Sequence, residues 1–275
     1  MPRYAQIIMG PAGCGKSTYC YHMQQHLELA GRTAHVINLD PAAENFEYPV
    51  AWDIRDVISV EDVSETLHLG PNGGLIYCME FLLQNLEVLD EALNYDDDYI
   101  LIDCPGQIEL YTHLPLMRQL MDHLQSLDYK LVAVYLLDCQ FIDDTAKFFA
   151  GVLSAMSAML QLEVPHLNLL SKMDLLGEDR RRDLDDFLSA DADMLLATAN
   201  MYTTERQQRL NSAMANLIDD FSLVRFLPLD NTDEGNLEAI LINTDHCLQY
   251  GEEEEPREPA DLDNDRNDDD SSFPM

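Results

Sequence analysis

Gly10-Pro11-Ala12-Gly13-Cys14-Gly15-Lys16-Ser17-Thr18 decides the fold, because this stretch matches the pattern G-x-x-x-x-G-K-[ST]. An apolar run at 4–9 precedes it, and residues 18–27 follow without any proline or glycine. Strand, glycine-rich loop and helix therefore come in the order that a phosphate-binding P-loop requires. The alternative is a chance glycine turn before a helix, and the flanking strand and helix argue against it.

The residue types in this loop suit phosphate chemistry. Glycines let the backbone curl so that successive N–H groups point at phosphate oxygens, and the following helix adds its positive N-terminal end. We expect Lys16 to reach the β- and γ-phosphates and the Ser17 hydroxyl to bind Mg²⁺. The residues expected to bind nucleotide here are Gly13, Cys14, Gly15, Lys16, Ser17 and Thr18.

The chain is strongly acidic, since its 275 residues carry 51 acidic and 16 basic side chains, a net charge of −35. Residues 251–275 hold 11 acids and 2 bases, and their Glu, Asp, Asn, Pro and Ser content predicts a disordered tail. Such charge disfavours direct binding to nucleic acid and favours basic partners, although acidity that serves only solubility is an equal alternative. The length of residues 1–250 fits one large domain.

Cysteine usage and hydropathy point to the compartment. The six cysteines form no C-x-x-C pair, which is typical of reduced, buried thiols. The chain begins with a core strand rather than a signal peptide, and it has no uncharged apolar span of about 18 residues. We therefore expect a cytoplasmic protein without a membrane segment.

Two further apolar runs, 33–39 and 99–102, are each followed by an aspartate. Asp40 is a candidate for Mg²⁺ or for the attacking water, while a helix cap or a turn before Pro41 is an equal alternative. Asp103 begins the pattern D-x-x-G-Q and is expected to hold Mg²⁺, directly or through water. Gly106 allows close approach to a γ-phosphate, and Gln107 is placed to orient the attacking water.

A third motif follows the apolar run 166–170, where Ser171-Lys172-Met173-Asp174 resembles the guanine-recognition motif [NT]-K-x-D. A carboxylate accepts hydrogen bonds from guanine N1–H and the 2-amino group together, whereas adenine presents a lone pair at N1. We therefore expect Asp174 to select guanine and Lys172 to pack along the base. A solvated lysine and a helix-capping aspartate are the alternative.

The remaining chain completes an α/β fold, with a mostly parallel central sheet flanked by helices and a helical insertion or outer layer at 178–221. Residues 70–72 read Gly-Pro-Asn, which predicts a tight turn. Residues 53–67 suggest short helices. Apolar spacing predicts longer helices at 74–93, 110–127, 143–161 and 237–248, and strands at 4–9, 33–39, 99–103, 131–138, 166–170 and 224–230.

Together, these motifs resemble those of the GPN-loop GTPases over about residues 1–250. The resemblance rests on the P-loop, Asp40-Pro41-Ala42, Gly70-Pro71-Asn72, the run from Asp103 to Gln107, and Ser171 to Asp174. It implies a P-loop GTPase that uses GTP, GDP and Mg²⁺ and works as a dimer with itself or with a paralogous GPN-loop GTPase. In this family the Gly-Pro-Asn loop reaches into the other subunit's nucleotide site, so the resemblance gives Asn72 the role of stabilising the transferring phosphate.

The resemblance also implies a cellular role, in which family members assist RNA polymerase II assembly and nuclear import. RNA polymerase II subunits or assembly factors are then the expected partners, and the protein is expected to enter the nucleus from the cytoplasm. Ser171 departs from the family, which often has Thr or Asn there. A serine offers no amide to the base or loop, so guanine selectivity is expected to depend mainly on Asp174.

Two classes of function fit these motifs. The first is an enzyme, a Mg²⁺-dependent GTPase switch in which Lys16, Asp40, Asn72 and Gln107 act in catalysis and Ser17 and Asp103 hold the metal. The second is a nucleotide-stabilised assembly adaptor with little turnover. A small-molecule kinase shares the P-loop, but the K-x-D motif and the absence of a basic lid argue against it.

Overall fold

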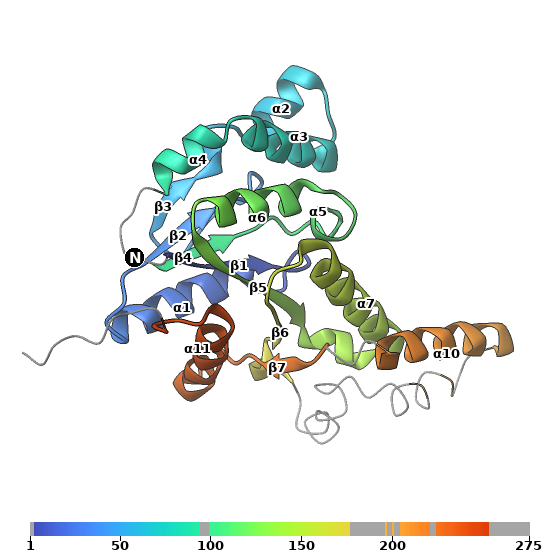
Figure 1. Cartoon of the computed structure of the whole chain (residues 1–275). Helices are drawn as coiled ribbons and strands as arrows, with labels where there is room; N and C mark the ends of the chain where they lie inside the picture. The colour runs from blue at the N-terminus through green and yellow to red at the C-terminus, as the bar shows by residue number, and fades with distance from the viewer. Residues whose placement is uncertain are drawn as a thin grey trace, which may run out of the picture.

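Seven parallel strands form one sheet in the computed structural model of the chain, in the order β3-β2-β4-β1-β5-β6-β7 (Figure 1). The structure describes residues 3–93, 99–176, 196, 200, 204–220 and 224–252. The expected α/β fold is confirmed, and the sheet is parallel throughout. The strands are β1 (Arg3–Met9), β2 (Ala34–Asn38), β3 (Val50–Asp53), β4 (Tyr99–Asp103), β5 (Tyr129–Asp138), β6 (His166–Ser171) and β7 (Phe226–Pro228).

The central strands read as continuous apolar runs because helices cover both faces of the sheet. Every residue of β4 is buried, and so are all residues of β1 after Arg3. In the register, Ile8 pairs with both Asp103 and Val134, so β1 lies between β4 and β5 at the middle of the sheet. This position puts the P-loop, which follows β1, at the centre of the sheet's carboxyl edge.

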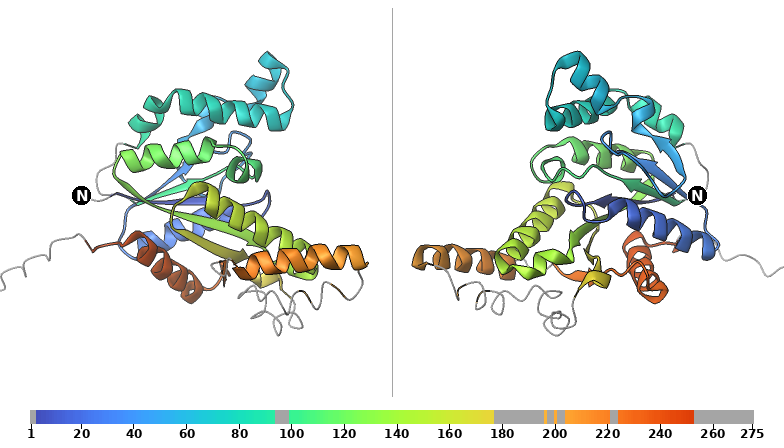
Figure 2. Two further views of the ribbon diagram at one scale, coloured as in Figure 1. Left: turned by 45° about the vertical axis from the view of Figure 1, so that its right-hand side comes forward. Right: turned by 180° about the vertical axis from the view of Figure 1, so that it is seen from behind.

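Two hydrophobic cores lie on opposite faces of the sheet (Figures 1 and 2). The helices α1 (Lys16–Leu29) and α11 (Glu234–Leu248) cover one face. The other face carries α3 (Pro71–Gln84), α4 (Leu86–Ala92), α5 (Glu109–Thr112), α6 (Leu116–Ser126) and α7 (Thr145–Leu162). The helix α10 (Glu205–Asp220) projects beyond the body from its contact with α7.

Two of the long helices expected from apolar spacing are divided in the structure. The helix expected at 74–93 is two helices that meet at Asn85, where the Asn85 amide donates to the Phe81 carbonyl. The helix expected at 110–127 is also wrong as a single element, because Pro115 separates α5 from α6. Proline lacks the N–H that a continuous helix needs and restricts the residue before it.

Residues 70–72 open a helix, so the expected tight turn is wrong. Gly70 is the N-cap of α3, Pro71 is its first residue, and the Gly74 N–H donates to the Gly70 carbonyl at 2.8 Å. Proline is favoured at this position, since its fixed φ suits a helix and its missing N–H would be unpaired there anyway. Asn72 therefore lies in the first turn of α3, held by a regular element.

The short edge strand β3 was not expected from the sequence. Only four residues form it, and it pairs with β2 alone. The short helices expected at 53–67 follow it as a 3₁₀ turn, Ile54–Asp56, and α2 (Val60–Leu67). Of the expected helical layer at 178–221, α10 is described and most of the remainder lies outside the described residues. Within the described part of the chain, no helix is long and apolar enough to cross a membrane.

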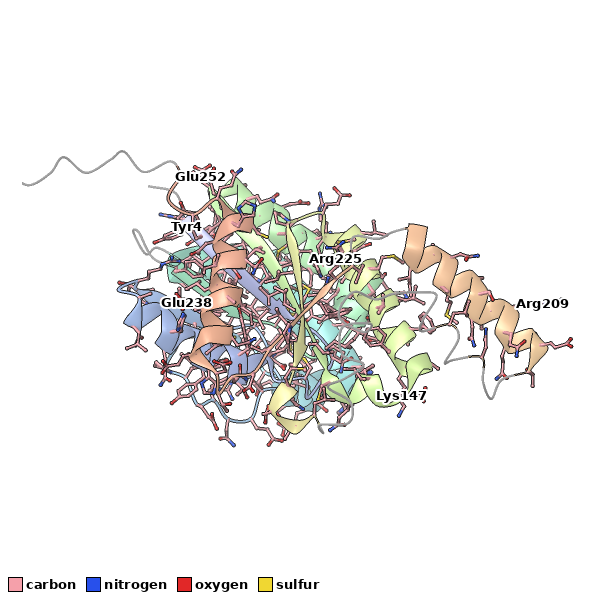
Figure 3. All side chains as sticks on the ribbon, turned by 90° about the horizontal axis from the view of Figure 1, so that it is seen from below. Tyr4, Lys147, Arg209, Arg225, Glu238 and Glu252 are labelled. Carbon is pink, nitrogen blue, oxygen red and sulfur yellow. The ribbon has the colours of Figure 1, made fainter. Side chains whose placement is uncertain are left out.

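The chain leaves the domain at the edge of the sheet opposite the P-loop. Tyr250 packs on Tyr4 at the start of β1, with 4.6 Å between ring centroids, and the Arg32 guanidinium lies 3.9 Å from the centroid of the Tyr250 ring. The Gly251 N–H donates to the Tyr4 hydroxyl, and Tyr4 and Glu252 lie at the same end of the molecule (Figure 3). The expected tail begins here, and from residue 253 onward it lies outside the described residues.

Deleting residues 253–275 is expected to leave GTP affinity unchanged. The described residues just before the deletion, Tyr250 and Gly251, contact Tyr4 at the edge of the sheet opposite the loops that would contact nucleotide. Its composition does not supply enough apolar surface for a packed core. GTP titration of the truncated and full-length chains checks this, and a large loss of affinity on truncation would contradict it.

Candidate functional site

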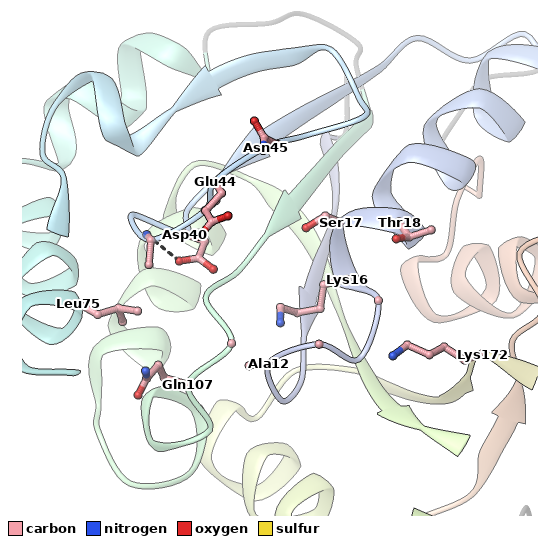
Figure 4. Close-up of a pocket in the computed structure, with 15 residues that line it drawn as sticks. Ala12, Lys16, Ser17, Thr18, Asp40, Glu44, Asn45, Leu75, Gln107 and Lys172 are labelled. Atoms are coloured by element: carbon pink, nitrogen blue, oxygen red, sulfur yellow. Dashed lines mark hydrogen bonds between the residues drawn. The ribbon is translucent and has the colours of Figure 1, made fainter. Parts of the chain in front are cut away.

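A cavity of about 680 Å³ lies at the carboxyl edge of the sheet, bounded by the loops that follow β1, β2, β4 and β6 (Figure 4). Open parallel sheets bind ligands at this edge. Most of the residues expected at the site line it, but Cys14, Asn72, Asp103, Ser171, Met173 and Asp174 do not. The lining residues are Ala12, Gly13, Gly15, Lys16, Ser17, Thr18, Asp40, Ala42, Ala43, Glu44, Asn45, Leu75, Gly106, Gln107 and Lys172.

The P-loop curls in the way that phosphate binding needs. Gly10, Gly13 and Gly15 have φ angles of 142°, 77° and 92°, a backbone region that favours glycine. A Cβ added at Gly10 would lie 2.3 Å from the Leu136 carbonyl oxygen. The Lys16 ammonium donates to the carbonyls of Gly10 and Pro11, both at 3.2 Å, so the loop itself holds this cation beside the cavity.

Ser17 and Asp103 come together behind the P-loop. The Ser17 side chain lies close enough to the Asp103 carboxylate to lower its pKa, and the Tyr48 hydroxyl donates to Asp103 Oδ2 at 2.8 Å. Burial raises the pKa of the Asp103 carboxyl above its usual value, while the interactions with Ser17, Tyr48 and Lys16 act in the opposite direction. Asp103 is only 2% exposed, so its oxygens depend on these partners rather than on bulk water.

This pair of oxygen donors fits Mg²⁺. Magnesium prefers hard oxygen ligands and is commonly held by one or two carboxylates together with substrate phosphates and water. The described residues include no group of three or more His, Cys, Asp or Glu side chains that could hold a metal by themselves. A hydroxyl and a carboxylate beside a phosphate-binding loop therefore suit a metal that arrives with a nucleotide.

Asp40 makes a turn bond and also lines the cavity. Its Oδ1 accepts from the Ala42 N–H at 2.9 Å, which is the turn bond, and its side chain also lines the cavity (Figure 4). Burial raises the pKa of the Asp40 carboxyl, against the hydrogen bond from Ala42 and the charge of Lys16. The Asn38 side chain holds the Asp40 backbone on both sides, by donating to its carbonyl and accepting from its N–H.

Gln107 and Asn72 meet within the same chain at the mouth of the cavity. Gln107 Nε2 donates to Asn72 Oδ1 at 3.0 Å, and this bond is exposed to solvent. The neighbouring Gly106 packs directly on the P-loop, because a Cβ there would lie 2.8 Å from the Ala12 Cα. This packing on the P-loop brings Gln107 to the cavity, while the approach of Gly106 to a γ-phosphate stays a prediction. The fold of one chain thus places Asn72 beside its own chain's Gln107.

The motif 171–174 contacts the P-loop through its first two residues. The buried Ser171 hydroxyl is 2.7 Å from the Cys14 carbonyl and 3.2 Å from the Leu137 carbonyl, so serine does reach the loop, as a hydroxyl rather than an amide. Lys172 lines the cavity beside Gly15 and forms an ion pair with Asp138 at 2.7 Å.

The last two residues of this motif lie away from the cavity. Met173 is buried and donates its N–H to the Leu229 carbonyl, which ties the motif to the loop after β7. Asp174 is exposed within a short 3₁₀ helix and does not line the cavity.

Sequence reasoning missed several side chains that shape the site. Asp138 ends the buried strand β5, so the strand-end argument applied to Asp40 and Asp103 could have found it. Tyr48 lies in the connection from β2 to β3, Asp53 ends β3 and Arg55 follows in the 3₁₀ turn. No local pattern marks Tyr48, because its partner Asp103 is distant in sequence, and Asp53 was missed together with the unexpected strand that it ends.

The parallel sheet, the glycine loop after its central strand and the paired Ser17 and Asp103 define a P-loop nucleotide-binding protein. Curated relatives identify the family more closely. The chain is 54% identical to GPN-loop GTPase 3 of Mycosarcoma maydis, covering 96% of this chain and 98% of that one. It is 50% identical to GPN-loop GTPase 3 of Dictyostelium discoideum, over 96% and 93% of the two chains, and 48% identical to that of Xenopus tropicalis, over 99% and 97%. The chain therefore belongs to the GPN-loop GTPase family.

A family model and a solved structure also match the chain. The family model, described as "Conserved hypothetical ATP binding protein", matches residues 8–250. A crystal structure of a GTPase from Pyrococcus abyssi in its apo form superposes with a TM-score of 0.75, covering 88% of this chain and 96% of that one at 24% identity. The description of the family model names ATP and the relatives' names indicate GTP, so nucleotide choice is a direct experimental question.

Proposed function

We propose that this protein is a Mg²⁺-dependent GTPase whose catalytic unit is a dimer, either with itself or with a paralogous GPN-loop GTPase. Family membership supports GTP hydrolysis, and the observation that carries the proposal for this chain is the cavity around Lys16. The P-loop amides, the Lys16 ammonium and the paired oxygens of Ser17 and Asp103 all lie at one edge of the sheet.

In the proposed reaction a water attacks the γ-phosphorus in line with the bond to the β–γ bridging oxygen, and that bond breaks to leave GDP and phosphate. Lys16 and the loop amides stabilise the charge that spreads over the phosphate oxygens. Ser17 and Asp103 would hold Mg²⁺, which supplies further charge neutralisation. Gln107, and Asn72 from the partner as in the family, would orient the water and the phosphate. Asp40, which also lines the cavity, would help to hold the water.

Guanine selection is assigned to Asp174, with Lys172 along the base. Replacing Asp174 by asparagine exchanges one acceptor oxygen for a donor amide, so GTP binding is expected to weaken relative to xanthosine triphosphate. A hydrogen bond to a charged group such as this carboxylate is typically worth about 1.5–3 kcal/mol.

A binding panel of GTP, ATP and xanthosine triphosphate, measured on both chains, checks this assignment. The unaltered chain is expected to prefer GTP, and the Asp174→Asn chain is expected to shift towards xanthosine triphosphate. An unchanged preference for GTP in the variant would remove Asp174 from base recognition. A preference of the unaltered chain for ATP would favour the family model's description and reopen the kinase alternative.

The cellular role is proposed from the family resemblance alone: assistance to RNA polymerase II assembly and nuclear import, with subunits or assembly factors of the polymerase as partners. The protein is then cytoplasmic and enters the nucleus. The net charge of −35 favours basic partners and disfavours nucleic acid. Purification from cells, with identification of stoichiometric partners, tests this role.

A nucleotide-stabilised adaptor is the second candidate. The observation that favours it is the exposed hydrogen bond between Asn72 and Gln107, which pairs two expected catalytic side chains with each other. A chain that kept this pairing with GTP bound would hold nucleotide with little turnover.

A further inference from the structure

Of the two expected metal ligands, Ser17 and Asp103, only Asp103 lies in a strand, so hydrogen bonds of the sheet fix its main chain. It ends β4 between β1 and β2, its carbonyl accepts from the Leu39 N–H at 2.8 Å, and its register partners are Ile8 and Asn38. Only the side-chain torsions of Asp103 remain to be set. A carboxylate that must face a metal needs those torsions fixed as well, because misplacement of a ligand weakens the site.

Tyr48 supplies that constraint from outside the cavity. Its hydroxyl donates to Asp103 Oδ2 at 2.8 Å, and both side chains are buried, with 4% of Tyr48 and 2% of Asp103 exposed. Tyr48 does not line the cavity, whereas Ser17, whose side chain lies near the same carboxylate, does. Asp103 is therefore held between a residue on the cavity wall and a residue behind it.

The orientation of Tyr48 is itself determined by the connection from β2 to β3. The ring of Phe46 packs on that of Tyr48, with 5.1 Å between centroids, and the Arg55 guanidinium lies 4.5 Å from the centroid of the Phe46 ring. Arg55 is fixed by Asp53, with an Nη2–Oδ2 distance of 2.6 Å, and it also donates to the Ala43 carbonyl. Asp53 Oδ1 in turn accepts from the Asn38 amide that holds the Asp40 backbone.

We propose that Tyr48 is a positioning residue for Asp103, which fixes the carboxylate beside the Ser17 hydroxyl so that the two oxygens face the metal of a nucleotide–Mg²⁺ complex. Phe46 and Arg55 hold Tyr48 in place, and the same connection carries Asp40. The inference rests on the proposed function, because it assumes that Asp103 holds Mg²⁺. It adds a residue that does not itself touch nucleotide or metal.

The test is a Mg²⁺ titration of GDP binding, measured with a fluorescent GDP on the full chain. Tyr48→Phe removes the donor and leaves Oδ2 buried without that partner, so the Mg²⁺ concentration at half-effect is expected to rise about tenfold. GDP affinity in EDTA is expected to stay the same, since no contact with the nucleotide changes. A merely structural role of the hydroxyl would lower the melting temperature and leave the Mg²⁺ midpoint in place.

Tyr129→Phe is the matched control. It also removes a buried tyrosine hydroxyl, which donates to the Leu93 carbonyl at the opposite edge of the sheet. Its Mg²⁺ midpoint is expected to equal that of the unaltered chain. An equal shift in both variants, or no upward shift in Tyr48→Phe, would overturn the proposal. Phe46→Leu provides a second variant, with a smaller upward shift expected because the hydroxyl stays but loses its aromatic support.

Asp103→Ala separates this inference from the proposed function. If GDP binding by that variant still responds to Mg²⁺ as in the unaltered chain, the metal assignment fails and the role of Tyr48 fails with it. If Asp103→Ala abolishes the response and Tyr48→Phe leaves it unchanged, only the inference about Tyr48 is overturned.

Discussion

Replacing Asn72 by alanine is expected to slow GTP hydrolysis by about 10²–10³-fold, the typical cost of losing one preorganised donor to a transition state. GTP binding is expected to stay nearly intact. Asn72 is exposed and neutral, and its side chain is outside the cavity of its own chain. Its amide both donates and accepts, so it can hold a phosphoryl oxygen and the water together. Single-turnover hydrolysis and GTP titration of the same variant measure the two quantities.

A mixed dimer decides which site Asn72 serves. Lys16→Ala disables one nucleotide site, and Asn72→Ala is placed either in the same subunit or in the other one. If Asn72 acts on the partner's site, placing both changes in one subunit makes the intact site slow. Placing them in different subunits leaves that site facing an unaltered loop, so it turns over.

The alternative is that Asn72 acts on the nucleotide site of its own chain, and the hydrogen bond from Gln107 to Asn72 within one chain would explain that result. If Asn72 acts on its own site, the two arrangements exchange their rates. Equal rates would mean that residues 70–72 only start a helix. Unaltered dimers and dimers carrying Lys16→Ala alone are the controls, since they give the rates of two sites and of one.

Lys16→Ala is expected to weaken GTP binding by about 10–100-fold, because a hydrogen bond to a charged phosphate is worth about 1.5–3 kcal/mol. The affinity for guanosine, which has no phosphate, is expected to be unchanged. Two loop carbonyls hold the Lys16 ammonium beside the cavity in which the phosphates are expected.

The effect of Lys16→Ala on nucleotide binding is compared with that of Asp103→Ala. Asp103→Ala is expected to make nucleotide binding largely insensitive to added Mg²⁺, since Asp103 is assigned to the metal rather than to phosphate. Titrations of GTP and guanosine with both variants, with and without Mg²⁺, give the pattern. If Lys16→Ala abolished the Mg²⁺ response and Asp103→Ala weakened phosphate binding regardless of Mg²⁺, both assignments would be overturned.

The sequence predicted the class of fold and the place of most expected site residues, because these follow from local patterns. The pattern G-x-x-x-x-G-K-[ST] between a strand and a helix is typical of a phosphate-binding loop. Aspartates that follow buried strands meet at one edge of a parallel sheet. Asp40 and Gln107 line the cavity on this account, while Asp103 lies just behind it, beside Ser17.

Other features depend on contacts that local patterns do not encode. Residues 70–72 carry strong turn residues, yet proline at the first helical position allows them to begin α3. The strand β3 was missed because its four residues are stabilised by pairing with β2. Tyr48 reaches Asp103 across 55 positions of sequence, and only the folded loop brings the two together.

The central claim is that this chain hydrolyses GTP at the cavity around Lys16. It is tested most directly by single-turnover release of phosphate from GTP, by the purified chain alone and together with a paralogous GPN-loop GTPase. We expect phosphate release that requires Mg²⁺ and that Asn72→Ala slows about 10²-fold or more. Stoichiometric GTP binding, with phosphate release no faster than that of Asn72→Ala both alone and with the partner, would contradict the claim and support the adaptor.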